Sequence, residues 1–182
     1  MPSQQNSWSP KLVGALITFG SLALCILALP TRFPGMTLMD LSPNWLLIWL
    51  VAWSINRPVA LAVITGTALG FLQDAMTIPS DVTIAPTHAL GMAIAGGLTA
   101  LLQKQRYMQE DFISIAFIVF GMAVVVETAI AVQLTLMGAD VNKVWLLHQR
   151  IALGSAILSS LWSPVLHLPL SRWWRAQEKV ED

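Results

Sequence analysis

Apolar residues occur in six long blocks that are separated by short polar or proline-containing segments. A helix that crosses a bilayer needs about 20 mainly apolar residues. The blocks predict helices at Leu12–Leu29, Trp45–Ile55, Val59–Gln73, His88–Leu102, Phe112–Met137 and Ile151–Leu170. Prolines interrupt residues 30–43 and 74–87, which predicts turns outside the hydrocarbon because proline lacks a backbone donor. The pattern therefore predicts an all-α polytopic membrane bundle of six transmembrane helices.

Residues 1–182 are expected to form a single integral membrane domain, with disordered ends at 1–10 and 176–182. The first apolar block is longer than the roughly 7–15 residues of a signal-peptide core. It also lacks a clear cleavage site, and Leu24 precedes Cys25 where a lipoprotein signal would have a small residue. We expect this block to be a retained spanning helix.

The second and third blocks are short, and only "INRP" separates them. One alternative is a single kinked helix from Trp45 to Leu72, which would leave five spans and place Arg57 near the middle of the bilayer. That placement costs at least about 2.5–3.5 kcal/mol on insertion scales. A tight hairpin that lets Arg57 reach the headgroups is favoured.

Basic residues orient the predicted spans, because cytoplasmic loops are enriched in lysine and arginine. Six spans with a cytoplasmic N-terminus place seven basic residues inside and three outside. The inner set is Lys11, Arg57, Lys104, Arg106, Arg172, Arg175 and Lys179, and the outer set is Arg32, Lys143 and Arg150. The five-span alternative gives six against three. Both arrangements place the C-terminus in the cytoplasm.

Composition supports a membrane protein and excludes several functional classes. Hydrophobic residues make up 55% of the chain and charged residues 11%, against about 25% charged in soluble domains. A net charge of zero gives no electrostatic case for binding nucleic acid. Walker, GxSxG, CxxC and HExxH motifs are absent, and the three histidines lack metal-ligand spacing. We therefore expect no enzyme activity, no cofactor and no metal site.

Small residues line one face of the third predicted helix and end in a carboxylate. Ala62, Gly66, Gly70 and Asp74 are spaced by four, so they share a face on which another backbone can approach closely. His88 opens the next helix on the same side of the membrane. A hairpin could bring Asp74 and His88 together, or Asp74 could be solvated at its helix end while His88 simply begins the next helix.

Further small or aromatic faces occur on other helices. Gly91 with Ala95, and Ala93 with Gly97, suit close packing of the fourth helix on two sides. Ala152, Ser155, Ser159 and Ser163 form a similar face on the sixth. Trp45, Trp49 and Trp53 recur along one face of the second helix, where lipid or interfacial packing and contact with a partner are the two interpretations.

Glu127 lies well inside the fifth block, in "VVVETAIAVQ". An ionised carboxylate that faces lipid would be too costly there. Glu127 must therefore be neutral, paired across the bundle, or exposed to water or to a partner. Arg150 is the nearest plausible mate. A functional site and structural hydrogen bonding both remain open for this residue.

The run "RPVALAVITGTALGFLQDAM", followed after a loop by "HALGMAIAGGLTALL", resembles the central part of MreD, the rod shape-determining membrane protein family of bacteria. The places of the family pattern are occupied by Gly70, Asp74, His88, Ala89, Leu90 and Gly91. The specific match covers roughly 44–102. The resemblance implies a fold similar to the substrate-binding components of energy-coupling-factor transporters, in the bacterial inner membrane.

The resemblance also implies a non-enzymatic scaffold of the peptidoglycan elongation complex. Such a scaffold would bind MreC and, indirectly, the filament MreB, a SEDS glycosyltransferase and a class B penicillin-binding transpeptidase, in contact with membrane lipids. The candidate partner-binding or pocket residues are Gly66, Gly70, Asp74, His88, Gly91 and Glu127. The alternative is a small-molecule-binding membrane component of a transporter, with Glu127 and the interior serines at the ligand.

Overall fold

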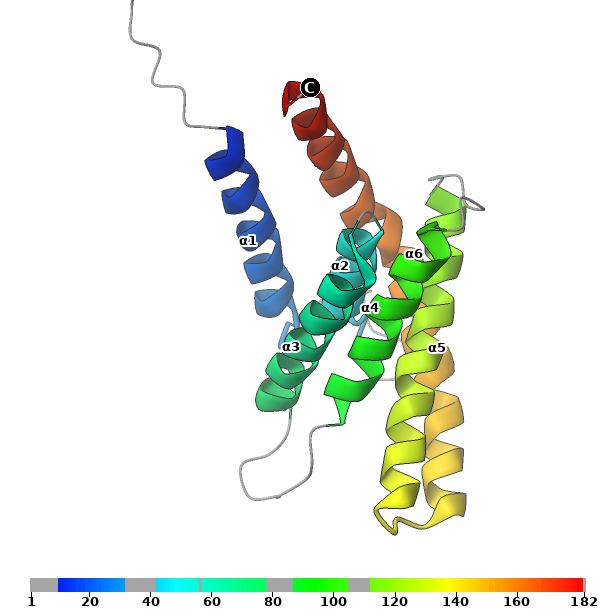
Figure 1. Ribbon diagram of the computed structural model, residues 1–182. Coiled ribbons are helices and arrows are strands. Elements are labelled where there is room, and N and C mark those ends of the chain that lie inside the picture. Colours follow the sequence, from blue (N-terminus) through cyan, green and yellow to red (C-terminus); the bar gives the residue numbers. More distant parts are fainter. Residues whose placement is uncertain (1–9, 32–41, 56, 78–86, 105–111, 182) are drawn as a thin grey trace, which may run out of the picture.

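The computed structural model describes residues 10–31, 42–55, 57–77, 87–104 and 112–181, and these ranges fold as helices and their connections (Figure 1). Within these ranges six α-helices follow one another: α1 Pro10–Ala28, α2 Trp45–Ser54, α3 Val59–Thr77, α4 His88–Lys104, α5 Phe112–Leu136 and α6 Val141–Glu181. The described ranges contain no strand, so the all-α prediction is confirmed. The N-terminal residues predicted to be disordered lie almost wholly outside these ranges.

Successive helices alternate in direction, so that the start of α1 and the end of α6 lie at the same end of the bundle (Figure 1). The helix α3 packs along α4, and α5 packs along α6. The α5–α6 hairpin extends beyond the lower ends of α3 and α4 in this view. Residues 137–140 form its turn, in which Gly138 has a φ of 91° that favours glycine.

The short helix α2 forms the centre of the core. It contacts all five other helices, and its residues 46–52 are buried on every side. A helix that is apolar all round is expected at such a position. Its 10 residues extend only about 15 Å, which is half the hydrocarbon thickness of roughly 30 Å.

A side chain from the last helix completes the start of α2. The Asn44 side chain accepts a hydrogen bond from the Leu47 N–H at 3.1 Å and caps the helix. The Asn44 backbone N–H in turn donates to Ser159 Oγ, in α6, at 3.0 Å. Ser159 is fully buried. The serine face of α6 is therefore used inside the bundle.

The helix α1 is peripheral: among the described helices it contacts α2 and α6 alone, and it exposes large apolar side chains such as Leu16 and Phe19. Trp49 of α2 faces it, is buried, and donates through Nε1 to Ser21 Oγ at 3.0 Å. Trp49 also stacks on Trp53. Packing against lipid is therefore the wrong interpretation for Trp49, which joins two helices of the same chain.

A break between α2 and α3 separates the second and third apolar blocks. The chain leaves the helix at Ser54 and begins a new one at Val59, so the single kinked helix from Trp45 to Leu72 is not formed. Arg57 is exposed, with its guanidinium carbon 5.4 Å from the ring centroid of Trp53. This contact is a cation–π arrangement, as expected of an arginine held at a helix end.

The helix α6 is much longer than predicted. It spans 41 residues, beginning ten residues before Ile151 and continuing through 176–181, where we expected a disordered end. Pro164 lies inside it and cannot donate to the Ser160 carbonyl. The Ser163 hydroxyl donates to that carbonyl instead, at 2.8 Å. A neighbouring hydroxyl thus satisfies the carbonyl that the proline leaves free, as occurs in membrane helices.

Three of the described helices are long and apolar enough to cross a membrane: Val59–Thr77, Ile113–Leu136 and Val141–Trp173. The apolar parts of the others are shorter, at Leu12–Ala28, Trp45–Ser54 and His88–Leu102. The structure therefore gives an all-helical bundle with three helices of spanning length, and the six-span count stays a prediction.

Candidate functional site

The small-residue face of α3 packs against α4 with almost no space between the backbones. A Cβ added to Gly66 would lie 2.3 Å from the Met92 carbonyl oxygen, and one added to Gly70 would lie 2.3 Å from the Ala89 Cα. From the other side, a Cβ on Gly96 would lie 2.6 Å from the Ala62 carbonyl oxygen. Real Cβ atoms do not approach backbone atoms this closely. Glycine is therefore required along this interface, which we call the α3–α4 seam.

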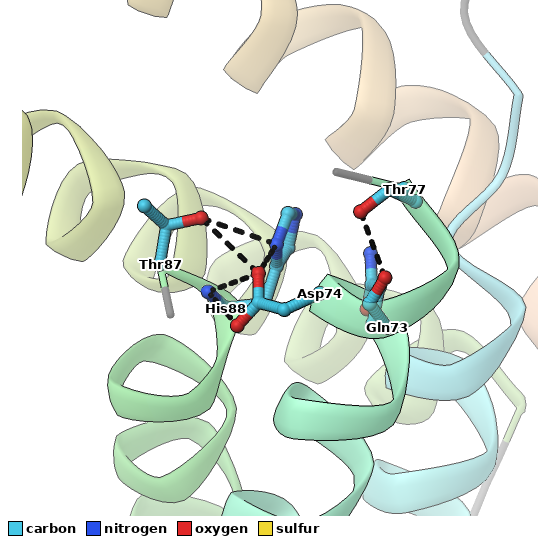
Figure 2. Close-up of polar contacts among 5 residues, drawn as sticks. All are labelled: Gln73, Asp74, Thr77, Thr87 and His88. Atoms are coloured by element: carbon cyan, nitrogen blue, oxygen red, sulfur yellow. Dashed lines mark hydrogen bonds and ion pairs between the residues drawn. The ribbon is translucent and has the colours of Figure 1, made fainter. Parts of the chain in front are cut away.

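Asp74 ends the seam and caps the first turn of α4 (Figure 2). The His88 backbone N–H donates to both carboxylate oxygens of Asp74, each at 3.1 Å. The Thr87 hydroxyl donates to Oδ1 at 3.2 Å. A helix N-terminus carries unsatisfied N–H groups and a positive dipole end, both of which favour a carboxylate. The cap of α4 thus comes from a different helix.

The His88 ring adds a fourth contact to this carboxylate. Its Nδ1 lies 2.6 Å from Asp74 Oδ1, and because the carboxylate is an acceptor, the proton is assigned to Nδ1. The side chains of Asp74 and His88 are 5% and 20% exposed. Of the two alternatives for this pair, direct contact is the one that the structure shows. The cluster of Asp74, Thr87 and His88 therefore fixes the end of α3 to the start of α4.

Two residues beside this cluster, Thr87 and Gln73, were not singled out from the sequence. Thr87 is buried, and its place directly before an apolar helix is a recognised capping signal. Gln73 is also buried, and its side-chain oxygen has no hydrogen-bond partner among the described residues. Thr77 donates to the Gln73 backbone carbonyl at 2.7 Å, within the same helix end (Figure 2).

Gly91 and Glu127 extend the site to α5. A Cβ on Gly91 would lie 3.0 Å from the Val126 carbonyl oxygen, so the next face of α4 is also closely packed. Glu127 follows Val126, is partly exposed, and interacts electrostatically with His88. The described residues show no ion pair between Glu127 and Arg150. The pairing of Glu127 with Arg150 is therefore not formed among the described residues, and His88 lies within electrostatic range of Glu127 instead.

The six predicted site residues thus occupy two adjoining interfaces. Gly66, Gly70 and Gly91 are buried within them, whereas Asp74, His88 and Glu127 bring three polar side chains from α3, α4 and α5 to one region. Within the described ranges no group of three His, Cys, Asp or Glu side chains could hold a metal ion. This geometry fixes helices relative to one another and presents a histidine and a glutamate at the edge of the bundle.

Comparison with known proteins identifies the family. The chain matches the family described as rod shape-determining protein MreD over residues 11–172. No curated protein and no solved structure matched the chain, so the similarity to energy-coupling-factor transporter components stays a prediction. The family match covers all six helices apart from the first residue of α1 and the last turns of α6. It implies a role in rod shape determination. The chain therefore belongs to the MreD family of shape-determining membrane proteins.

Proposed function

We propose that this protein is a non-enzymatic scaffold of the peptidoglycan elongation complex that binds MreC. The observation that carries the proposal is the cluster of Asp74, Thr87 and His88, with Glu127 beside it. Its contacts hold the ends of two helices in one geometry and leave His88 and Glu127 partly exposed. A rigid edge with a few accessible polar groups is suited to docking, because little conformational entropy is lost on binding.

The proposed topology has six spans in the bacterial inner membrane with both termini in the cytoplasm. It is supported by the alternating helix directions (Figure 1) and by the bias of basic residues toward one side. In this topology the cluster lies at the periplasmic end of α3 and α4. The membrane-proximal segment of MreC would dock there, and MreC would link the scaffold to MreB, the SEDS glycosyltransferase and the class B transpeptidase.

Co-purification of MreC from detergent tests this proposal. Glu127 has no hydrogen bond among the described residues, so Glu127→Gln should leave the fold intact while reducing MreC recovery. His88→Ala removes the second accessible group and should act in the same direction. Asp140→Ala is the matched control, because Asp140 is an exposed acid that caps the start of α6, away from the cluster. Undiminished MreC recovery and normal rod shape with both site variants would refute this docking surface.

A second candidate function is binding of a small molecule as a transporter component. The observation that favours it is a groove of about 430 Å³ between α4 and α5, which Thr128 and Gln133 line together with apolar side chains. This volume is within the range of ligand pockets. A small molecule that co-purifies with the protein and is lost in Thr128→Val would support this function over the scaffold.

A further inference from the structure

The length of α6 fixes where two arginines lie in the bilayer. Arg150 and Arg172 are both exposed, and the segment between them contains no Asp, Glu, Lys or Arg. A helix of that length rises roughly 33 Å, which matches the hydrocarbon thickness of about 30 Å. Arg150 therefore lies at the depth of one headgroup layer and Arg172 at the depth of the other.

Around Arg150, the surface of α6 is hollowed along one face. A groove of about 510 Å³ is lined by Leu146, Arg150, Leu153, Gly154 and Ile157, among others. A second groove, of about 380 Å³, lies between α5 and α6 and shares Ile157 with the first. Its walls are almost wholly apolar and include Phe117 and Pro164. We call these two grooves together the α6 groove.

The α6 groove carries its charge at one point along the helix. Arg150 is the only charged side chain that lines either groove, and within the described part of the chain it forms no ion pair or hydrogen bond. Lys143 lies two turns earlier on the same helix face. A ligand that complements this surface has an anionic group at headgroup depth and an apolar chain that follows the groove into the hydrocarbon.

We propose that the α6 groove binds an anionic phospholipid, with its phosphate at Arg150 and an acyl chain over Gly154 and Ile157. The bilayer presents such molecules at this depth, and arginine binds phosphate with two parallel hydrogen bonds. An apolar partner helix would leave the guanidinium without an anion. This site lies on α6, away from the Asp74 cluster, so it does not depend on the proposed MreC surface.

Native mass spectrometry of the full chain, with added phosphatidylglycerol or phosphatidylcholine of identical acyl chains, tests the proposal. The chain should retain phosphatidylglycerol more strongly. Arg150→Gln should reduce that retention by about fivefold, as expected for one basic residue at an anionic lipid surface. Ile157→Trp should fill the junction of the two grooves and reduce retention as well. Ile157 is exposed, so this second variant does not disturb the core.

Matched controls separate this site from general lipid adhesion. Arg172→Gln removes a cation at the other headgroup layer, and Val165→Trp adds bulk at an exposed position of α6 outside the groove walls. Both should retain phosphatidylglycerol as the unaltered chain does. Glycerol phosphate, which has no acyl chain, should not compete. The proposal is overturned by equal retention of the two lipids, by unchanged retention in Arg150→Gln, by competition from glycerol phosphate, or by an acidic partner helix bound at Arg150.

Discussion

Gly70 and Ala89 lie in backbone contact, so that a methyl group on Gly70 would come within 2.3 Å of the Ala89 Cα. The atoms that this methyl group would meet belong to the backbone of α4 and not to a flexible side chain. The α3–α4 seam could therefore accept the methyl group only if the two helices moved apart. The seam directly precedes Asp74, so the separation would also pull the carboxylate away from its donors on α4.

Gly70→Ala should therefore destabilise the protein by about 1–3 kcal/mol, the usual effect of overpacking. Its matched control is Gly121→Ala, since a Cβ there would meet nothing within 4 Å. That control should be neutral or stabilising by up to about 1 kcal/mol, because alanine favours helix more than glycine does. The free energies of unfolding in mixed detergent micelles, followed by circular dichroism, would show the difference. Equal values for the two variants would contradict the close seam.

Asp74→Ala should lower the free energy of unfolding by about 2–3 kcal/mol. The substitution removes a helix cap and leaves the buried Thr87 hydroxyl and the His88 amide without their acceptor. Asp74→Asn retains one acceptor oxygen and should cost about 1 kcal/mol. The measurement is the free energy of unfolding of the unaltered chain, Asp74→Asn and Asp74→Ala under the same conditions, which should decrease in that order. An alanine variant as stable as the original would show that the cap is not formed in the membrane.

Ser159→Ala tests the contact between the last helix and the start of α2. Loss of the Asn44 N–H bond should cost about 1 kcal/mol. Ser160→Ala is the neighbouring control, because the Ser160 hydroxyl is exposed and bonds only to its own helix at Ile157. Thermal unfolding midpoints should fall for the first variant and stay unchanged for the second. A lower midpoint for Ser160→Ala than for Ser159→Ala would show that Asn44 does not bond to Ser159.

Reporter fusions at the two termini test the proposed topology. Six spans require both ends on the cytoplasmic side, so a reporter that is active only in the periplasm should be inactive at either end. A fusion after residue 138, in the α5–α6 turn, should be active. Termini on opposite sides would refute the six-span arrangement and would move Asp74 and His88 away from the proposed docking side.

Hydropathy predicted where four helices begin, because Trp45, Val59, His88 and Phe112 each follow a polar residue or a proline-containing turn. It failed for α6, since Lys143, His148 and Arg150 interrupt the apolar block although the helix continues through them. Hydropathy reports the part of a helix that lies in lipid. The Asp140 carboxylate, which accepts from the Asn142 N–H at 3.0 Å, is the local signal that marks the true start.

The sequence indicated the residues of the site but only some of their contacts. The spacing of Gly66, Gly70 and Asp74 predicted a close face, and a hairpin between the two helices was one of two alternatives that would bring Asp74 to His88. Nothing local could predict that Ser159 reaches Asn44, since 115 residues separate them. The neighbour of Glu127 was also unpredictable, because it depends on how α4 and α5 are rotated against each other.

The arrangement at Asn44 has a consequence for biogenesis. The ribosome delivers α2 long before α6, so α2 enters the insertion machinery while its Ser159 acceptor has not yet been synthesised. With only about 15 Å of helix, α2 is too short to settle across the membrane alone. The core around α2 therefore stays incomplete during synthesis until α6 has been translated and supplies Ser159.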